Sequence, residues 1–438
     1  MDGLLPPDLL REVRCRFAYV DGDPSTPQRI FLDTASGSLR LESMIAALAE
    51  QTRWPDQLGR ASEGSRRAGE IVEHGLEDVS LFLGAHDGAI VPAMSGTHAM
   101  FRAVHAALGD ERGGNVVTTN LEHACVYDST RVFADAVGAE WRVADLDPAT
   151  GRVPVEAILA RVDAQTRLIA TIHGSNVTGA VQDLTTLTAE ARRISPNVLV
   201  AVDGVQYAPH APVDVHELGV DAYVFSPYKV FCVKGIGFAW LSPRMSGHGH
   251  WKLRGKPDDD WMLGSPCDAT YAAWSNVVDY LCWMGTQTGG TGDRRQRLLA
   301  GMRASHAHST ALLHRLLEGA DGVPGLRRME HVTLIGMDDD LQRRVLLALF
   351  NVSGLDGSQV AEHLRRRGIV VQGRKADIYC GHAFDGLGQP GAVRVSGCHY
   401  NTPDEIDACL GAINELRSMG ADEIALIGAA PVRSGQEG

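Results

Sequence analysis

The sequence lacks long apolar runs, paired cysteines and an excess of basic charge. Its opening stretch, MDGLLPPDLLREVRCRF, carries acidic residues early and no extended apolar segment, so we expect no secretion signal. The most apolar stretches, NVLVAVDGV and RVLLALFNV, are far shorter than the ~20 residues of a membrane-spanning helix. These absences predict a cytoplasmic protein with no membrane partner.

The distribution of cysteine, histidine and charge excludes further classes. The eight cysteines are scattered and no two stand in CxxC spacing, which predicts reduced thiols and no structural zinc site. The pairs His248/His250 and His306/His308 have no neighbouring cluster of acids or thiols, so we expect no metal. The net charge of −13 argues against a nucleic-acid partner, which would favour a basic face.

The length and the apolar pattern indicate two folding units. A chain of 438 residues exceeds the size at which one hydrophobic core usually stops growing. Short apolar runs alternate with helical patterns between about residues 80 and 245, which predicts an α/β unit with a mostly parallel sheet covered on both faces. The expected division is an N-terminal arm (1–30), a large domain (31–292) and a smaller α+β domain (293–438).

Individual elements follow from the same patterns. The expected strands of the large domain are 115–119, 167–172, 197–202, 221–226 and 236–241, with helices at 153–162 and 184–194. A long helix is expected at about 293–318, followed by strands at 331–336, 344–352, 368–373 and 392–397. Thr402 and Glu405 have the spacing of a capping box at the start of the last helix.

Two motifs suggest a site for a phosphorylated ligand. Ser95, Gly96, Thr97 and His98 precede a helical pattern, and the unpaired N–H groups of a helix N-terminus suit a phosphate, although an ordinary cap explains the same residues. Asp203 ends a strongly apolar strand, where ligands of open α/β sheets bind. A carboxylate there can keep a pyridine nitrogen protonated; the alternative is a strand-end aspartate bonded to the backbone.

A lysine follows the next expected strand. Lys229 lies in the turn SPYK directly after the strand end, and in a partly dry crevice its amine would serve as a nucleophile and proton carrier. Lys234 is the competing candidate, but it lies in a glycine-flanked loop. We therefore predict Lys229 as the reactive amine.

The order and spacing of these motifs resemble the class V aminotransferase and cysteine desulfurase group of enzymes that use pyridoxal 5′-phosphate (PLP). The similarity extends over most of the chain and includes the segments FLDTASGS (31–38), NLEHACVYDS (120–129), IHGSNVTGAVQDL (172–184), LGSPCDATYAAW (263–274) and RVSGCHYNT (394–402). It implies PLP fold type I, similar to aspartate aminotransferase, with a mostly parallel seven-stranded sheet in the large domain and a smaller C-terminal α+β domain.

The resemblance also implies residue roles. Lys229 would carry PLP as a Schiff base, Asp203 would pair with the pyridine nitrogen, and His123 would stack on the ring as the third catalytic residue. Cofactor contacts would further include Gly96, Thr97, His98, Asn176, Gln206, Ser226, Tyr228 and, from a neighbouring subunit of a homodimer with shared sites, Ser265. The substrate would contact Ala35, Ser36, Asn176 and Arg394, with Arg394 holding the α-carboxylate.

Three departures from the family pattern limit what the resemblance implies about the reaction. The nucleophilic cysteine of the desulfurases corresponds to Ala376, and Cys380, four residues later, is either a substitute or an incidental buried thiol. Cys125 replaces an asparagine, and Ser265 replaces a threonine. A charged segment, KLRGKPDDDW (252–261), would shape the substrate entrance.

The leading hypothesis is therefore a PLP-dependent transferase or lyase acting on an L-amino acid. It would proceed through an external aldimine and a carbanion or quinonoid, with elimination, replacement or bond-forming chemistry in a biosynthetic role. A cysteine desulfurase or C–S lyase and an aminotransferase are the alternatives within the family. A non-catalytic protein that keeps the PLP fold is the alternative of another class. The substrate, the leaving group and any second substrate stay open at this point.

Overall fold

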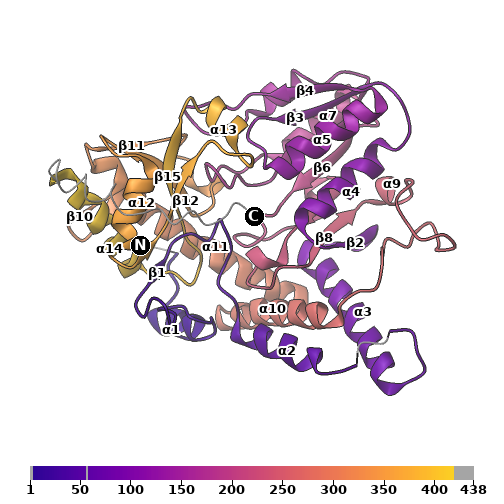
Figure 1. The fold of residues 1–438 in the computed structure, drawn as a ribbon, viewed down its shortest axis with the longest axis horizontal. Helices are drawn as coiled ribbons and strands as arrows, with labels where there is room; N and C mark the ends of the chain where they lie inside the picture. Colours follow the sequence, from indigo (N-terminus) through magenta and orange to yellow (C-terminus); the bar gives the residue numbers. More distant parts are fainter. Residues whose placement is uncertain (1–2, 56–57, 419–438) are drawn as a thin grey trace.

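The computed structural model describes residues 3–55 and 58–418. It contains a large sheet and a smaller sheet, each with its own helices (Figure 1). The ends of two expected domains, residues 1–2 and 419–438, lie outside the described residues. None of the described helices has the length and apolar character that a membrane crossing requires.

The large sheet has seven strands in the order β2-β8-β7-β6-β5-β3-β4. Only β8 runs antiparallel to its neighbours, so the predicted mostly parallel α/β sheet is confirmed. The strands are β2 (Ala89–Ala93), β3 (Asn115–Thr119), β4 (Glu140–Ala144), β5 (Thr166–Ile172), β6 (Leu199–Asp203), β7 (Ala222–Phe225) and β8 (Gly237–Leu241).

Helices cover both faces of this sheet. On one face α4 and α5 pack against alternate strand residues such as Val116, Ala201 and Val224. On the other face α3, α7 and α10 bury the intervening side chains, among them Val200 and Phe225. The helices of this part are α1 (Pro7–Cys15), α2 (Glu42–Thr52), α3 (Glu63–Leu83), α4 (Gly96–Leu108), α5 (Ala124–Val137), α6 (Val155–Leu159), α7 (Leu184–Ile194), α8 (Val215–Leu218), α9 (Pro243–Ser246) and α10 (Asp268–Gln287).

The small unit is built on a four-stranded antiparallel sheet in the order β11-β12-β15-β14, with helices α11, α12 and α14 packed around it (Figure 1). The predicted capping box of α14 is present, because Thr402 and Glu405 exchange side-chain and backbone hydrogen bonds. Its elements are α11 (Arg294–Glu318), β11 (Val332–Leu334), β12 (Leu347–Val352), α12 (Gly357–Arg365), β13 (Ile369–Val370), β14 (Gln372–Lys375), α13 (Gly381–Gly386), β15 (Gly391–Ser396) and α14 (Pro403–Glu415).

A short N-terminal strand joins the small unit. Strand β1 (Ile30–Phe31) pairs in parallel with β13, and Asp33 forms a bridge to Ser396 at the end of β15. The segment that was expected to begin the large domain therefore runs along the C-terminal unit before it reaches the large sheet. This crossing brings residues 33–38 to the boundary between the two sheets.

Candidate active site

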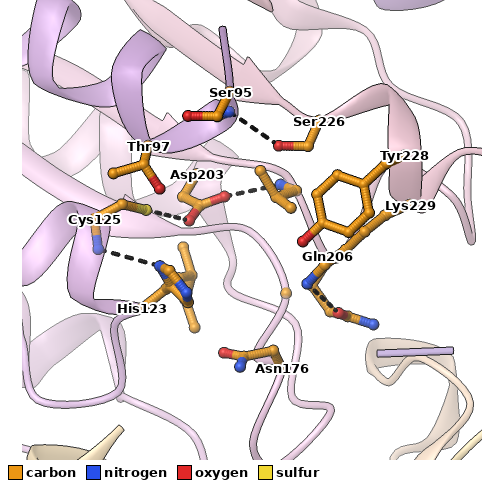
Figure 2. A pocket seen from close by; sticks show the side chains of 14 residues that line it. Ser95, Thr97, His123, Cys125, Asn176, Asp203, Gln206, Ser226, Tyr228 and Lys229 are labelled. Carbon is orange, nitrogen blue, oxygen red and sulfur yellow. Dashed lines mark hydrogen bonds between the residues drawn. The ribbon is translucent and has the colours of Figure 1, made fainter. Parts of the chain in front are cut away.

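The carboxyl ends of the parallel strands meet at one edge of the large sheet. Strands β3, β5, β6 and β7 end next to one another, and the residues that follow them line one cavity together with the N-terminus of α4 (Figure 2). Nine of the predicted residues line this cavity: Gly96, Thr97, His123, Asn176, Asp203, Gln206, Ser226, Tyr228 and Lys229.

Lys229 is the last residue of the short 3₁₀ turn η1 (Pro227–Lys229). This turn follows the end of β7, with Ser226 between the two. Its side chain is buried, and Nζ donates a hydrogen bond to Oε1 of Gln206 at 3.4 Å (Figure 2). Burial, and then the positive charge of Arg394, lower the pKa of Lys229 to about 8. About one tenth of this amine is therefore neutral and nucleophilic at pH 7, far more than for an ordinary lysine with a pKa of about 10.4. Lys234, the competing candidate, is exposed.

Asp203 is the last residue of β6 and is buried. Its Oδ1 accepts a hydrogen bond from the backbone N–H of Val205 at 2.9 Å. Its Oδ2 accepts one from the thiol of Cys125, with sulfur and oxygen 3.2 Å apart (Figure 2). The carboxylate therefore has a donor on each oxygen and faces the cavity opposite Lys229.

His123 caps the N-terminus of α5. Its Nδ1 accepts a hydrogen bond from the backbone N–H of Cys125 at 3.1 Å, which fixes the ring at the cavity wall. Burial lowers the pKa of His123, so the imidazole is neutral and presents an aromatic face. The ring of Tyr379 lies nearly parallel to it at an interplanar angle of 28°, with the ring centroids 6.0 Å apart.

The turn at the start of α4 is tightly fitted against the end of β7. The N–H of Gly96 donates to Oγ of Ser226 at 3.1 Å, and a Cβ at Gly96 would lie 2.4 Å from that oxygen. A larger residue at this position would therefore displace the Ser226 hydroxyl. His98 does not line the cavity: its Nδ1 accepts a weak hydrogen bond at 3.4 Å from the N–H of Met94.

Arg394 is fully buried on β15 behind the cavity. One of its Nη atoms donates to the backbone oxygen of Asn176 at 2.8 Å, and the other contacts Asp33 at 2.9 Å and Ser36 at 2.7 Å. It thereby connects the small unit to the cavity wall and to the N-terminal crossing. The N–H of Ala35 donates to Oγ of Ser396, so the buried Ala35 supports this arrangement through its backbone.

Besides His98, the predicted residues Ala35, Ser36, Arg394 and Ser265 do not line the cavity, and neither does Cys380. Ser265 is exposed in the segment before α10 and does not line the cavity. The Cys380 side chain is buried at the start of α13, where it contacts the guanidinium of Arg374 and lies 3.2 Å from Asp377. Burial raises the pKa of Cys380, whereas Ala376 is exposed. In this arrangement Tyr379 faces His123 and Cys380 does not.

The sequence patterns gave no indication of Glu122, a fully buried carboxyl beside the cavity. Its Oε1 accepts hydrogen bonds from the hydroxyls of Thr119 at 2.6 Å and Thr171 at 3.0 Å. Burial raises the pKa of Glu122 to about 8, so this group is largely protonated at neutral pH. The only available signal was its place in the segment NLEHACVYDS, directly before the histidine.

Two groups of described residues bring three potential metal ligands within 4.8 Å of one another. His123, Cys125 and Asp203 form one of them, but burial raises the pKa of the Cys125 thiol well above its usual value, which disfavours the thiolate that a metal needs. His86, Asp87 and His216 form the other, at the surface and away from the cavity. The cavity is therefore better suited to an organic ligand.

Comparison with known proteins agrees with this geometry. The sequence profile described as Aminotransferase class-V matches residues 30–263 and 297–409. The chain belongs to this family. Members of the family are PLP-dependent enzymes, and the chain is an enzyme of this class, which sets aside the non-catalytic alternative.

Relatives of the family cover nearly the whole chain. The aminotransferase-like protein FGM3 of Gibberella zeae is 28% identical over 425 residues, which are 92% of this chain and 97% of the relative. A probable cysteine desulfurase of Halobacterium salinarum is 27% identical over 410 residues, 89% and 92% of the two chains. The cysteine desulfurase structure from Thermococcus onnurineus has a TM-score of 0.78 at 22% identity, with 95% and 99% of the chains covered. The fold is therefore PLP fold type I.

Proposed function

We propose that this enzyme binds PLP at Lys229 and transforms an L-amino acid, beginning with removal of its α-proton. The observation that carries the proposal is the convergence of Lys229, Asp203 and His123 on one cavity. When bound, PLP supplies an electron sink that stabilises negative charge at the substrate's α-carbon. Elimination, replacement or bond formation are the reactions we favour, and transamination is the alternative that the family membership also allows.

The residues of the cavity fit PLP in kind and position. Gly96 leaves room beside Ser226 at a helix N-terminus, where backbone N–H groups favour a phosphate. Asp203 offers a carboxylate for the pyridine nitrogen, Gln206 lies beside the amine of Lys229, and the neutral ring of His123 provides a stacking face. Thr97 and Tyr228 line the same cavity and complete the proposed set of cofactor contacts. His98 fits this role less well, because it does not line the cavity.

Once substrate is bound, the residues of this chain have separable tasks. Lys229, the buried amine with the lowered pKa, takes the α-proton on Nζ. Arg394 holds the α-carboxylate, and Asn176 lies between Arg394 and the cavity because its backbone oxygen accepts from that guanidinium. Ser36 orients Arg394 through its hydroxyl. The buried surroundings of Lys229 exclude water from the proton-transfer step.

The test of this proposal is titration of the purified protein with PLP, followed by a screen of L-amino acids in D₂O. We expect visible absorbance to develop as PLP binds, and we expect NMR to show exchange of the Cα hydrogen for deuterium with the correct class of amino acid. Absence of both PLP absorbance and Cα exchange would overturn the proposal. Pyruvate-like products without the amino group would support elimination, whereas amino-group transfer to a keto acid would support the aminotransferase alternative.

Replacing Cys380 by alanine is expected to leave turnover within about twofold of the wild type. The thiol is buried against Arg374 and Asp377, and burial raises its pKa, so it is poorly suited to accept sulfur from a substrate. The measurement is sulfide release from cysteine, in parallel with turnover of any amino acid found in the screen. Loss of sulfide release in the Cys380→Ala variant, with Cys232→Ala as a matched buried-thiol control, would favour the cysteine desulfurase alternative.

We further propose a homodimer in which Ser265 contributes to the partner's phosphate site. In support, Ser265 is exposed, and so are the nearby large apolar side chains of Trp251, Leu253 and Leu263. Ser265→Asp should place a negative charge at the phosphate and abolish activity, as should Lys229→Ala. Light scattering should give twice the chain mass, and mixed Ser265→Asp and Lys229→Ala subunits should regain activity, because each hybrid contains one intact site. No recovery in hybrids would contradict a shared site.

We also propose a reducing, cytoplasmic setting. All eight cysteines are free thiols in the structure, and none is paired. Cell fractionation followed by thiol labelling of the denatured protein should recover the chain in the cytoplasmic fraction with eight reactive thiols. Recovery in a secreted fraction, or with disulfides, would contradict this setting.

A further inference from the structure

Three acidic groups are buried together where β3 and β6 end. Asp203 lies at the cavity wall, Cys125 contacts its Oδ2 from α5, and Glu122 lies two residues before the start of that helix. The contact between Cys125 and Asp203 joins residues 78 apart in sequence. Figure 2 shows the thiol of Cys125 directed at the carboxylate of Asp203, and Cys125 itself lines the cavity.

The surroundings favour the neutral forms of two of these three groups, Glu122 and Cys125. Burial raises the pKa of Glu122 to about 8, and Oε2 of its carboxyl has no hydrogen-bond partner among the described residues, which costs less for a neutral carboxyl than for a charged one. Burial raises the pKa of Cys125 well above that of an ordinary thiol, so its hydrogen stays on sulfur. Asp203, by contrast, accepts a hydrogen bond on each of its two oxygens.

The N–H of Val205 and the thiol of Cys125 therefore act on different oxygens of one carboxylate. The N–H of Val205 belongs to the backbone, so a substitution does not remove it. The thiol belongs to the side chain of Cys125, so a substitution can remove it. A hydrogen bond to a charged acceptor stabilises the ionised form, so the thiol favours the state of Asp203 that can hold a protonated ring nitrogen.

We propose that Cys125 is a positioning residue for Asp203: its thiol donates to Oδ2 and orients the carboxylate toward the cavity. The role toward the ring nitrogen of PLP rests on the proposed function, whereas the thiol–carboxylate bond itself does not. Substitution at this position would thus change how firmly the enzyme holds PLP in acid.

Several other titratable groups face Asp203 and must stay constant in a test of pH dependence. Helix α5 and the residues before it contribute Glu122, His123 and Cys125, β7 contributes Tyr223, and η1 contributes Tyr228 and Lys229. A variant that removes only the thiol of Cys125 leaves the other five groups in place. Cys125→Ala is such a variant, and Cys125→Ser restores a donor of similar size.

The first experiment uses the full chain without PLP. The infrared spectrum of Cys125→Ala is subtracted from that of the wild type, and the difference identifies the S–H stretching band of Cys125. We expect that band to be shifted to low frequency by the charged acceptor and to move to higher frequency in Asp203→Asn, whose amide is a weaker acceptor. A band that is the same in the wild type and in Asp203→Asn would overturn the proposal.

The second experiment measures the dissociation constant of PLP as a function of pH. In Cys125→Ala the acidic limb, where affinity is lost, should move upward by about one pH unit, because an ionised carboxylate that loses a donor takes up a proton more readily. Cys125→Ser should follow the wild type. Cys409→Ala, which empties a similar buried volume in the small unit, should lose stability without moving the limb. An unmoved limb in Cys125→Ala would overturn the proposal.

The two experiments separate this inference from the proposed function. If the wild type does not bind PLP, the proposed function fails, and the infrared band alone decides whether Cys125 acts on Asp203. If PLP binds and the limb of Cys125→Ala stays in place, the proposed function stands and the role of Cys125 is wrong. If Cys125→Ser also moves the limb by about one pH unit, the effect comes from packing and the proposal is overturned.

Discussion

Lys229→Ala is expected to lose covalent PLP attachment completely and to lower turnover by roughly 10³-fold or more, because the same amine carries the cofactor and moves the α-proton. Lys234→Ala is the matched control, since Lys234 is the nearby exposed lysine in the same loop. The measurements are the visible absorbance of the loaded protein and mass spectrometry after borohydride reduction. A PLP-modified peptide that contains Lys234 instead of Lys229 would contradict the assignment.

The pH dependence of attachment gives an independent check on the same residue. Burial, followed by the charge of Arg394, lowers the pKa of Lys229 to about 8. The amine is protonated and unreactive below that pH and neutral above it, so the attachment rate should rise with pH and level off above about pH 8. An exposed lysine with an ordinary pKa near 10.4 would show a rate still rising at pH 9. A rate that keeps rising there would contradict the buried environment of Lys229.

Arg394→Met is expected to destabilise the protein by about 3 kcal/mol, because it leaves the carboxylate of Asp33 without its charged partner in a largely buried position. The same change should lower kcat/KM by about 10- to 100-fold, since the α-carboxylate of the substrate loses a charge-assisted contact. Denaturant unfolding gives the first quantity, and steady-state kinetics gives the second.

A control separates stability from substrate binding. Arg315 in the small unit is also largely buried and forms an ion pair with Asp407, away from the cavity. Arg315→Met should therefore destabilise the protein while KM stays near the wild-type value. Adding Asp33→Asn to Arg394→Met should recover stability, because the unpaired charge is removed, but it should not recover KM. Equal KM values for Arg394→Met and Arg315→Met would contradict a substrate contact by Arg394.

The central strands were predictable from the sequence, whereas two outer strands were not. Strand β3 (Asn115–Thr119) and helix α7 (Leu184–Ile194) have the bounds that the patterns predict, and the other central strands agree within two residues. Strands β2 and β4 were missed: they lie at the two edges of the sheet, and both are only partly buried. Edge strands need no continuous apolar run, and β2 even contains Pro92. The apolar pattern by which a strand is recognised in the sequence is therefore weak in these two strands.

Some residues of the site were also predictable from the sequence, whereas others were not. Lys229, Asp203 and Gln206 follow strand ends, and the sequence alone indicates that such ends meet at one edge of a parallel sheet. The ion pair of Asp33 could not be predicted in this way. Its partner Arg394 is 361 residues away, and nothing local in the segment FLDTASGS indicates a buried ion pair. Tyr379 and Glu122 were missed for the same reason, since their roles depend on what packs against them.

Lys229, the fold and the family were thus determined by the sequence, through the residue types that stand at strand ends and through their order along the chain. The tertiary structure decided the electrostatics. It placed the thiol of Cys125 on Asp203, protonated Glu122 beside them, set the pKa of Lys229 to about 8 and turned Cys380 away from the cavity. The physical reason is that burial and charge–charge distance, which govern ionisation, arise only when distant segments pack together.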